Sequence, residues 1–327
     1  MQQQNSERKG YKKLYIFLGV FLVIGIIATG VLSNILYNSA LLRGGVVRLL
    51  PADKSVSLKD VLNGVNEAGE KNTGVNERLV KEAQACSITG FDGLSLHAYL
   101  LKNKRPGNKY AVICHGYTGT SSSMMSYAFK FYDMGFNILL PDARGHGKSE
   151  GDYIGMGWPE RLDIVDWAEY LTAVNPNAEI ILFGLSMGGA TVMMASGEDL
   201  PPNVKCIIED CGYSSVWEEF SFHMDNTLKI PKFPLLYTTS LVCKMKAGYT
   251  LKQASAVEQV KKSKTPILFI HGDKDQVVPF EMLNEVYNAA GCEKQRFIVK
   301  DATHAMAASV DPSGYWFTIQ SFILKYI

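Results

Sequence analysis

The stretch ILFGLSMGGATVMMASG, residues 181–197, decides the fold of this chain. It opens on a short apolar run typical of a buried strand and continues into a pattern typical of a helix. Ser186 stands at the junction, between Leu185 and Met187 and with glycines at positions 184 and 188. The pattern predicts a sharp strand-to-helix turn, because only glycine-sized neighbours let a strand and a helix approach so closely.

Such a turn would expose the serine hydroxyl. Ligands of open parallel sheets bind at the carboxyl ends of the strands, which is where Ser186 is expected. The N–H of Met187 and the start of the following helix would favour a developing negative charge there. The G-x-S-x-G spacing alone is a weak signal. Its place between a strand and a helix is what predicts a nucleophilic serine.

The chain around this stretch alternates between the two kinds of pattern. Continuous apolar runs predict strands at residues 110–116, 136–142, 204–210 and 266–273, with helical patterns between them. Strands that are apolar throughout are typical of a mostly parallel sheet with helices on both faces. We therefore predict an α/β fold with a doubly wound, mostly parallel sheet. The alternation breaks at about residues 213–260, which we interpret as a short cap insertion.

Composition sets the broad class of the protein. The 327 residues are 47% hydrophobic and 20% charged, with a formal net charge of +1. This is ordinary globular composition, long enough for one large α/β domain with an appendage or for two small domains. A nucleic-acid partner is not expected, because the chain has no basic excess to neutralise phosphates.

The N-terminus differs from the rest. Residues 1–13 carry Arg8, Lys9, Lys12 and Lys13, and residues 14–37 carry no charge. A signal peptide has a shorter apolar core, and a buried core helix has a polar stripe. The segment therefore predicts a transmembrane helix. The positive-inside rule predicts a cell-membrane protein with a cytoplasmic N-terminus and an extracytoplasmic main domain. A soluble cytoplasmic protein is the alternative.

Residues 38–82 are predicted to form a juxtamembrane connector, and residues 83–327 the main domain. The six cysteines of the chain show no C-x-x-C pair and no metal-ligand spacing. We expect mostly free thiols, since a disulfide framework is unusual in a domain of this size.

A serine nucleophile needs a base, and the base needs an acid that orients it. In strand–turn–helix hydrolytic sites the order along the chain is serine, acid, histidine. Of the six histidines, only His304 follows both Ser186 and a good acid. Asp275, in HGDKDQVVP, is the favoured acid, and Asp210 at the end of the preceding strand is its rival.

The sequence resembles the α/β-hydrolase family, in particular bacterial prolyl-oligopeptidase-like and carboxylesterase-like domains. The matching motifs are HGYTG, DARGHGKSEG, GLSMGG, HGDKDQVVP and DATHA, in family order over residues 83–327. The resemblance implies that Ser186 is the nucleophile, Asp275 the acid and His304 the base of a catalytic triad. It also implies an oxyanion hole made by the backbone N–H groups of Tyr117 and Met187. The chain lacks the HGGG loop of one esterase branch and a propeller domain.

These observations predict a membrane-anchored serine hydrolase that cleaves an ester through an acyl-enzyme, with no metal and no organic cofactor. The expected partners are a small acyl ester or a short peptide, and the membrane. A peptidase or amidase with the same triad is the first alternative, and a non-catalytic, membrane-tethered binding protein is the second. Aromatic residues of the insertion either line an acyl pocket or form its own core: Tyr213, Trp217, Phe220, Phe222 and Phe233.

Overall fold

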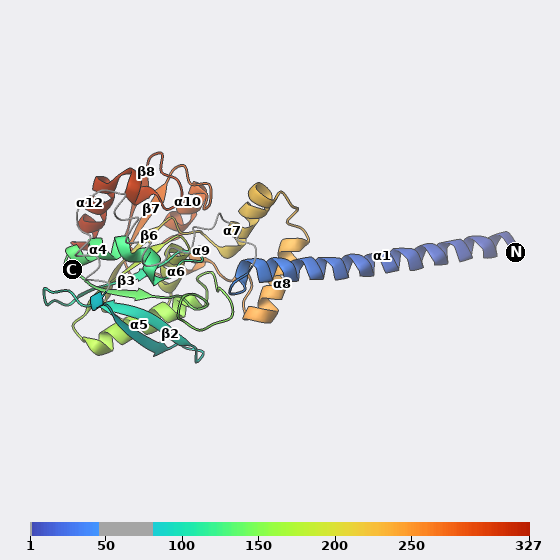
Figure 1. Ribbon diagram of the computed structural model, residues 1–327. Helices are drawn as coiled ribbons and strands as arrows, with labels where there is room; N and C mark the ends of the chain where they lie inside the picture. The colour runs from blue at the N-terminus through green and yellow to red at the C-terminus, as the bar shows by residue number, and fades with distance from the viewer. Residues whose placement is uncertain (1, 46–80) are drawn as a thin grey trace.

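The computed structural model describes residues 2–45 and 81–327, with side chains from Tyr15 onward (Figure 1). Most of the predicted connector therefore lies outside the described residues. Eight strands form one sheet in the order β1-β2-β4-β3-β5-β6-β7-β8. The strands are β1 (Gln84–Thr89), β2 (Ser95–Leu101), β3 (Lys109–Cys114), β4 (Asn137–Pro141), β5 (Glu179–Leu185), β6 (Val204–Asp210), β7 (Ile267–Gly272) and β8 (Lys294–Val299).

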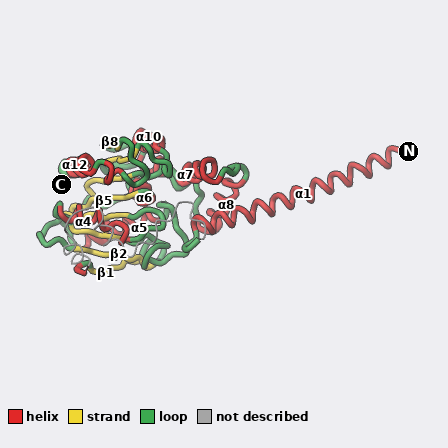
Figure 2. The backbone as a smooth tube through the Cα atoms, turned by 45° about the horizontal axis from the view of Figure 1, so that its top comes forward, coloured by secondary structure: helices red, strands yellow, loops and turns green. Residues whose placement is uncertain are grey.

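The sheet is parallel from β4 to β8, and only β1 and β2 run antiparallel to their neighbours. The predicted α/β fold with its mostly parallel sheet is confirmed. Beside the strands lie the helices α4 (Met125–Asp133), α5 (Glu160–Val174), α6 (Met187–Ala195), α10 (Phe280–Ala289), α11 (Ala307–Val310) and α12 (Pro312–Ile323), and a 3₁₀ turn, η1 (Ser121–Met124). Figure 2 shows the strands in yellow between the helices.

Alternate side chains of the central strands point to two separate cores. Leu182 of β5 belongs to the core that contains Trp167 of α5 and Leu283 of α10. Phe183, the next residue, belongs to the core that contains Phe131 of α4 and Phe322 of α12. The sheet is thus covered on both faces, which is why its central strands are apolar throughout.

The segment between β6 and β7 forms a cap made of α7 (Val216–His223), the π-helical turn η2 (Met224–Leu228), α8 (Leu235–Ala247) and α9 (Ala256–Val260). Buried residues of the cap, among them Val216, Leu236 and Val260, pack into the same core as α5 and α6. The cap is therefore continuous with the main domain. All six cysteines of the chain are free, as expected.

The N-terminal helix α1 (Gln2–Leu41) is longer than the predicted transmembrane segment and extends away from the domain (Figure 1). Among the described residues, the Tyr15–Leu41 part of α1 is the one helical segment whose length and composition would allow it to cross a membrane. Its large apolar residues are exposed as far as Ile35. Tyr37 and Leu41 are buried in the domain core, and the Ile154 N–H donates to the Leu41 carbonyl oxygen. The last two turns of α1 therefore belong to the folded domain.

The loop after β4 is fixed by a buried charge network. Arg144 is 2% exposed and donates to Asp163 (Nε to Oδ2, 2.7 Å) and to Asp92 (Nη1 to Oδ2, 2.6 Å). The carboxylate of Asp142 accepts from the backbone N–H groups of Ser121 and Lys148. The bond from Ser121 holds the DARGHGKS loop against η1, directly after the HGYTG loop.

Replacing Arg144 with methionine is expected to lower the free energy of unfolding by about 3–5 kcal/mol, because Asp163 would stay buried without its counter-charge. Urea unfolding of the full chain in detergent micelles measures the change. Arg161→Met is the control, because Arg161 pairs with Glu198 nearer the surface and its loss is expected to cost about 1 kcal/mol. Equal losses in the two variants would contradict this account.

Candidate active site

Ser186 sits at the corner between β5 and α6 in a strained backbone conformation, with φ +57° and ψ −118°. Non-glycine residues rarely adopt a positive φ, and such strain clusters at functional sites. A Cβ atom on Gly184 would overlap the carbonyl of Gly188, and one on Gly188 would overlap the carbonyl of Cys114. The absence of side chains at these two positions therefore lets α6 start directly above β5, as the sequence pattern predicts.

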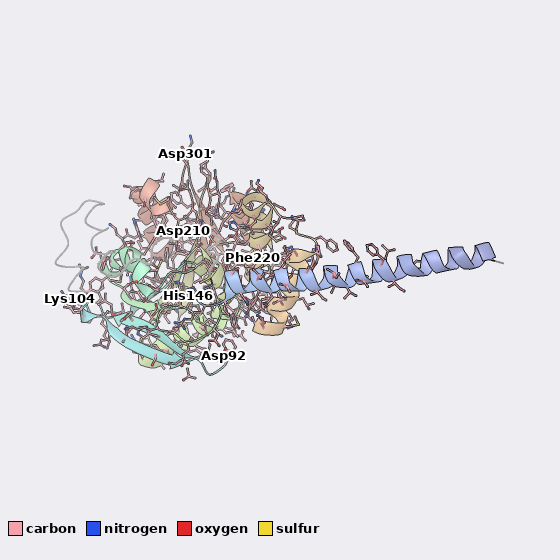
Figure 3. The ribbon with its side chains drawn as sticks, turned by 45° about the vertical axis from the view of Figure 1, so that its right-hand side comes forward. Asp92, Lys104, His146, Asp210, Phe220 and Asp301 are labelled. Carbon is pink, nitrogen blue, oxygen red and sulfur yellow. The ribbon has the colours of Figure 1, made fainter. Side chains whose placement is uncertain are left out.

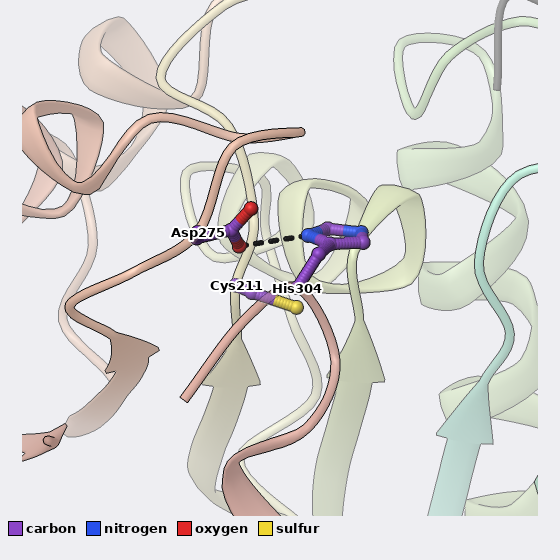
Figure 4. A group of neighbouring side chains, drawn as sticks. All are labelled: Cys211, Asp275 and His304. Carbon is purple, nitrogen blue, oxygen red and sulfur yellow. Dashed lines mark hydrogen bonds and ion pairs between the residues drawn. The ribbon is translucent and has the colours of Figure 1, made fainter. Parts of the chain in front are cut away.

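His304 lies in the loop after β8 and faces the serine. Its Nε2 is 2.9 Å from Ser186 Oγ, and its Nδ1 is 2.8 Å from Asp275 Oδ2 (Figure 4). An ionised carboxylate only accepts hydrogen bonds, so Nδ1 carries a proton and Nε2 is left to accept the serine proton. The three side chains thus form one continuous hydrogen-bonded chain that can move a proton off the hydroxyl.

Asp275 is held in place on both oxygens. Its Oδ1 accepts from the backbone N–H groups of Val277 (2.9 Å) and Val278 (3.0 Å). Its Oδ2 faces His304 and lies 3.3 Å from Nε2 of the buried His271. Burial alone would raise the pKa of Asp275, but hydrogen bonds from His271 and His304 outweigh it and hold that pKa well below its usual range. The carboxylate is therefore ionised at neutral pH.

Asp210, the rival acid, is directed elsewhere. It ends β6 near the middle of the domain (Figure 3), where its Oδ2 accepts from the hydroxyl of Tyr315 at 2.7 Å. Burial raises the pKa of Asp210 to about 6. Its backbone carbonyl accepts from the N–H of Ser186, so Asp210 supports the serine corner through its main chain.

Cys211 lies beside Asp275 and His304, close enough for the three ligand atoms to be within 4.8 Å of one another (Figure 4). Burial and the nearby carboxylates of Asp210 and Asp275 raise the pKa of this thiol well above its usual value. Metals bind the thiolate, and here the thiol keeps its proton. The trio therefore fits a metal ion poorly, and Asp275 and His304 are already paired with each other.

The HGYTG loop borders the serine. A Cβ atom on Gly116 would lie 3.4 Å from Ser186 Cβ, so the backbone just before Tyr117 approaches the hydroxyl closely. Met187 is the first residue of α6, where backbone N–H groups lack intrahelical partners. The side chain of Tyr117 turns away, and its hydroxyl donates to the carbonyl oxygen of Ala40 at 2.6 Å. This contact joins the loop to the last turn of α1.

Three features of the site were not predicted from the sequence: the hydrogen bond from Tyr117 to α1, the support of Asp275 by His271, and Glu219. Glu219 of α7 is buried and accepts from His223 at 3.1 Å. Its burial raises its pKa, and the charges of both His304 and Asp275 act on it. The hydrogen bond of Tyr117 and the position of Glu219 depend on contacts between distant segments. Only the run HGDKD, with a histidine four residues before Asp275, hints at one of them.

The cap aromatics divide between the two roles considered for them. Tyr213 is buried and donates to the carbonyl oxygen of Met156, so it is a core residue. Phe220 borders a small cavity between α1, α7 and α8. Trp217 and Phe222 are half-buried, whereas Phe233 is 76% exposed. Of the five, Phe220 alone lines a described cavity.

Comparison with known proteins agrees with this geometry. Residues 107–224 match the model of a family described as serine aminopeptidase, S33. The Bacillus subtilis protein YqkD is 28% identical over 213 residues, which cover 65% of this chain and 70% of YqkD. A Saccharomyces cerevisiae protein described as a membrane protein is 22% identical over 236 residues, covering 72% of this chain and 77% of the yeast protein.

Among solved structures, the Pyrococcus furiosus esterase Pf2001 superposes with a TM-score of 0.63 at 23% identity. The match covers 79% of this chain and 97% of the esterase. At this identity the likeness establishes the fold. The match covers almost the whole esterase. The esterase therefore corresponds to the main domain of this chain.

The buried Glu209 of β6 makes stability depend on pH. Burial raises its pKa to about 8. A carboxyl whose pKa is higher in the folded protein than in the unfolded chain stabilises the fold below the unfolded value, and this contribution is lost as pH rises through the folded value. We therefore expect Glu209 to lower the free energy of unfolding between pH 5 and pH 8, by at most about 1.4 kcal/mol per pH unit.

Glu209→Gln removes this titration, so the variant should lose less stability than the parent chain over that range. Denaturant unfolding at pH 5, 6.5 and 8 gives, for each protein, the slope of the free energy of unfolding against pH. Glu258→Gln is the matched control, since Glu258 is a glutamate with a largely exposed side chain. If the stability of Glu209→Gln falls with pH as steeply as that of the parent chain and of the control, the pH dependence does not come from Glu209.

Proposed function

We propose that this chain, a hydrolase of the α/β-hydrolase family, cleaves an ester bond through a Ser-His-Asp triad and an acyl-enzyme. The observation that carries the proposal is the unbroken hydrogen-bonded chain from Ser186 through His304 to Asp275. A serine on a strained turn, with its base and acid both in hydrogen-bond contact, is the arrangement required for nucleophilic catalysis.

In the first half of the reaction, Ser186 Oγ attacks the ester carbonyl carbon while its proton passes to Nε2 of His304. Asp275 stabilises the imidazolium that results. The carbonyl oxygen becomes an oxyanion, and we assign its stabilisation to the backbone N–H groups of Met187 and Tyr117. His304 then returns the proton to the leaving alkoxide, and an alcohol departs. The acyl group stays on Ser186.

In the second half, water takes the place of the alcohol. His304 accepts a proton from the water as its oxygen attacks the acyl carbon, and then returns that proton to Ser186 Oγ as the acyl–oxygen bond breaks. The products are a carboxylic acid and the free enzyme. No step of this cycle uses a metal or a cofactor.

Glu219 supports an aminopeptidase as the second candidate. Its Oε2 is buried, and it has no hydrogen-bond partner among the described residues. Burial raises its pKa, and the charges of His304 and Asp275 also act on that pKa. A carboxylate in that position would bind the ammonium group of a peptide N-terminus. The family whose model matches residues 107–224 is described as an aminopeptidase.

Ser186→Ala should abolish covalent labelling by a fluorophosphonate probe and lower turnover by about 10⁶-fold, while the fold stays intact. Hydrolysis of p-nitrophenyl esters of graded chain length, beside aminoacyl-anilides, separates the esterase from the peptidase. Stoichiometric labelling of the variant would mean that another serine reacts. A parent chain that neither labels nor turns over any substrate would favour the non-catalytic binding protein.

In the same assays, Asp275→Asn should lower the turnover number by about 10⁴-fold with little change in binding, because the histidine loses its orienting carboxylate. Asp210→Asn is the matched control and should cost far less, since Asp210 bonds Tyr315 instead. If both variants fold and Asp210→Asn has the lower turnover number, then the assignment of Asp275 as the acid is wrong.

We propose that α1 anchors the protein in the cell membrane as a single span, with residues 1–13 in the cytoplasm and the hydrolase domain outside. The length and apolar composition of Tyr15–Leu41 support the anchor, as does the membrane assignment of the yeast relative. Four basic residues precede the span, whereas Arg43 and Arg48 are the two that directly follow it, and this bias supports the orientation.

Protease added to intact cells after removal of any wall barrier is therefore expected to digest the domain, while a cytoplasmic marker protein stays whole. Immunoblotting against a C-terminal epitope follows the domain. Complete protection of residues 83–327 in cells, with digestion after lysis, would reverse the orientation.

A further inference from the structure

The cap helix α8 presents a row of exposed apolar side chains. Phe233, just before the helix, is 76% exposed, and Tyr237, Leu241 and Met245 are 52%, 58% and 71% exposed. Residues four apart lie on one side of a helix, so the three helical positions form a continuous strip. The opposite side of α8 is buried in the domain. Contiguous exposed apolar surface of this kind marks an interaction site.

The position of α8 along α1 identifies what covers the strip. The large exposed apolar residues of α1 run from Tyr15 to Ile35, 21 residues that rise about 32 Å. The hydrocarbon core of a bilayer is about 30 Å thick. In the last turn of this part, the hydroxyl of Ser33 lies 2.6 Å from that of Thr238 in α8. The helix therefore meets α1 where the hydrocarbon core would end (Figure 1).

The charges around the strip also favour contact with a membrane surface. Between Asn226 and Lys252 the cap carries five lysines and no acidic residue. Lys252 lies over the rings of both Trp217 (4.4 Å) and Tyr237 (5.5 Å). Tryptophan and tyrosine gather at membrane–water interfaces, and basic residues near a membrane attract anionic lipid headgroups.

We propose that α8 lies in the headgroup layer of the bilayer crossed by α1, and that the active site takes its substrate, a long-chain acyl ester, from that bilayer. The substrate class rests on the proposed esterase function, and the docking of α8 does not. Docking would fix the domain on the bilayer surface at two points, α1 and α8, and would prevent it from turning about a single tether.

Apolar side chains also line the contact between α1 and the cap. The small cavity between α1, α7 and α8 is bordered by Leu36, Ala40, Phe220, Met224 and Leu236. The carbonyl oxygen of Ala40 accepts from Tyr117, in the loop beside Ser186. Figure 3 shows Phe220 close to the domain end of α1. A long acyl chain would leave the bilayer along this side of the cap.

Depth-dependent quenching tests the docking directly. The full chain carries a bimane label at Leu241→Cys. The control carries the label at Phe317→Cys on α12, because Phe317 is 72% exposed and α12 lies away from α1 (Figure 1). Both are placed in phosphatidylcholine–phosphatidylglycerol vesicles with nitroxide-labelled lipid, and the signal of the unsubstituted, equally treated chain is subtracted. We expect at least threefold stronger quenching at Leu241. Equal quenching at the two sites would overturn the proposal.

A second experiment tests the source of the substrate. Leu241→Glu with Met245→Glu is compared with Phe317→Glu, all in the full chain on vesicles. Hydrolysis of vesicle-embedded p-nitrophenyl palmitate should fall at least tenfold in the double variant, whereas hydrolysis of water-soluble p-nitrophenyl acetate should stay within twofold. The Phe317 variant should change neither rate. A palmitate rate that holds, or that falls in parallel with the acetate rate, would overturn the proposal.

The two proposals fail in different ways. If the parent chain hydrolyses neither ester, the esterase function and the substrate class fall together, while the quenching at Leu241 still decides whether α8 docks. If both esters are hydrolysed and Leu241 is no more quenched than Phe317, the esterase stands and the docking falls.

Discussion

The close crossing of β5 and α6 at Ser186 is the constraint on which the rest of the site depends. It brings the Cα of Gly188 against the carbonyl of Cys114 at the end of β3, and it sets Ser186 at a positive φ. A side chain at position 184 or 188 would push the helix away from the sheet and let the serine relax. The strain is stored by contacts that extend across three neighbouring strands, since the Ser186 N–H is bound by the carbonyl of Asp210 on β6.

The partners of Ser186 lie in the loops after β7 and β8, and pairing between those two strands sets their geometry. Gly272 at the end of β7 pairs with Val299 at the end of β8. Beyond the strands the two loops stay bonded, since the N–H of Lys274 donates to the carbonyl of Ala302. A Cβ on Gly272 would overlap that same carbonyl. Asp275 and His304 are thus placed by backbone contacts that begin in the sheet.

Local patterns in the sequence predicted much of the fold. Fully apolar strands, a glycine-flanked serine and the order of Ser186, Asp275 and His304 are all visible without a structure. Asp275 was favoured over Asp210, and the pairing of β7 with β8 brings the loop that carries Asp275 beside the loop that carries His304. The helical pattern after the strand predicted at residues 110–116 begins as a 3₁₀ turn, Ser121–Met124, before α4. Its serine-rich start offers little helix propensity.

Contacts between distant segments left no such pattern. An apolar run such as residues 14–37 predicts a helix of membrane length, but it does not say where lipid contact ends and protein contact begins. Contact between α1 and the cap includes Ser33, whose hydroxyl meets that of Thr238, more than two hundred residues away in the sequence. The burial of Glu219 beside the triad depends in the same way on how the cap folds back over the sheet.

The junction of α1 with the domain makes the end of this helix part of the folded domain. Tyr37 and Leu41 are among its most completely buried large side chains. The Ala40 carbonyl holds the Tyr117 side chain, whose backbone N–H is assigned to the oxyanion hole. A fragment that starts at residue 40 would lose Tyr37 from the core and would begin at the residue that orients this loop. The end of α1 therefore contributes to the shape of the candidate active site, and the smallest intact folded unit includes the last two turns of this helix.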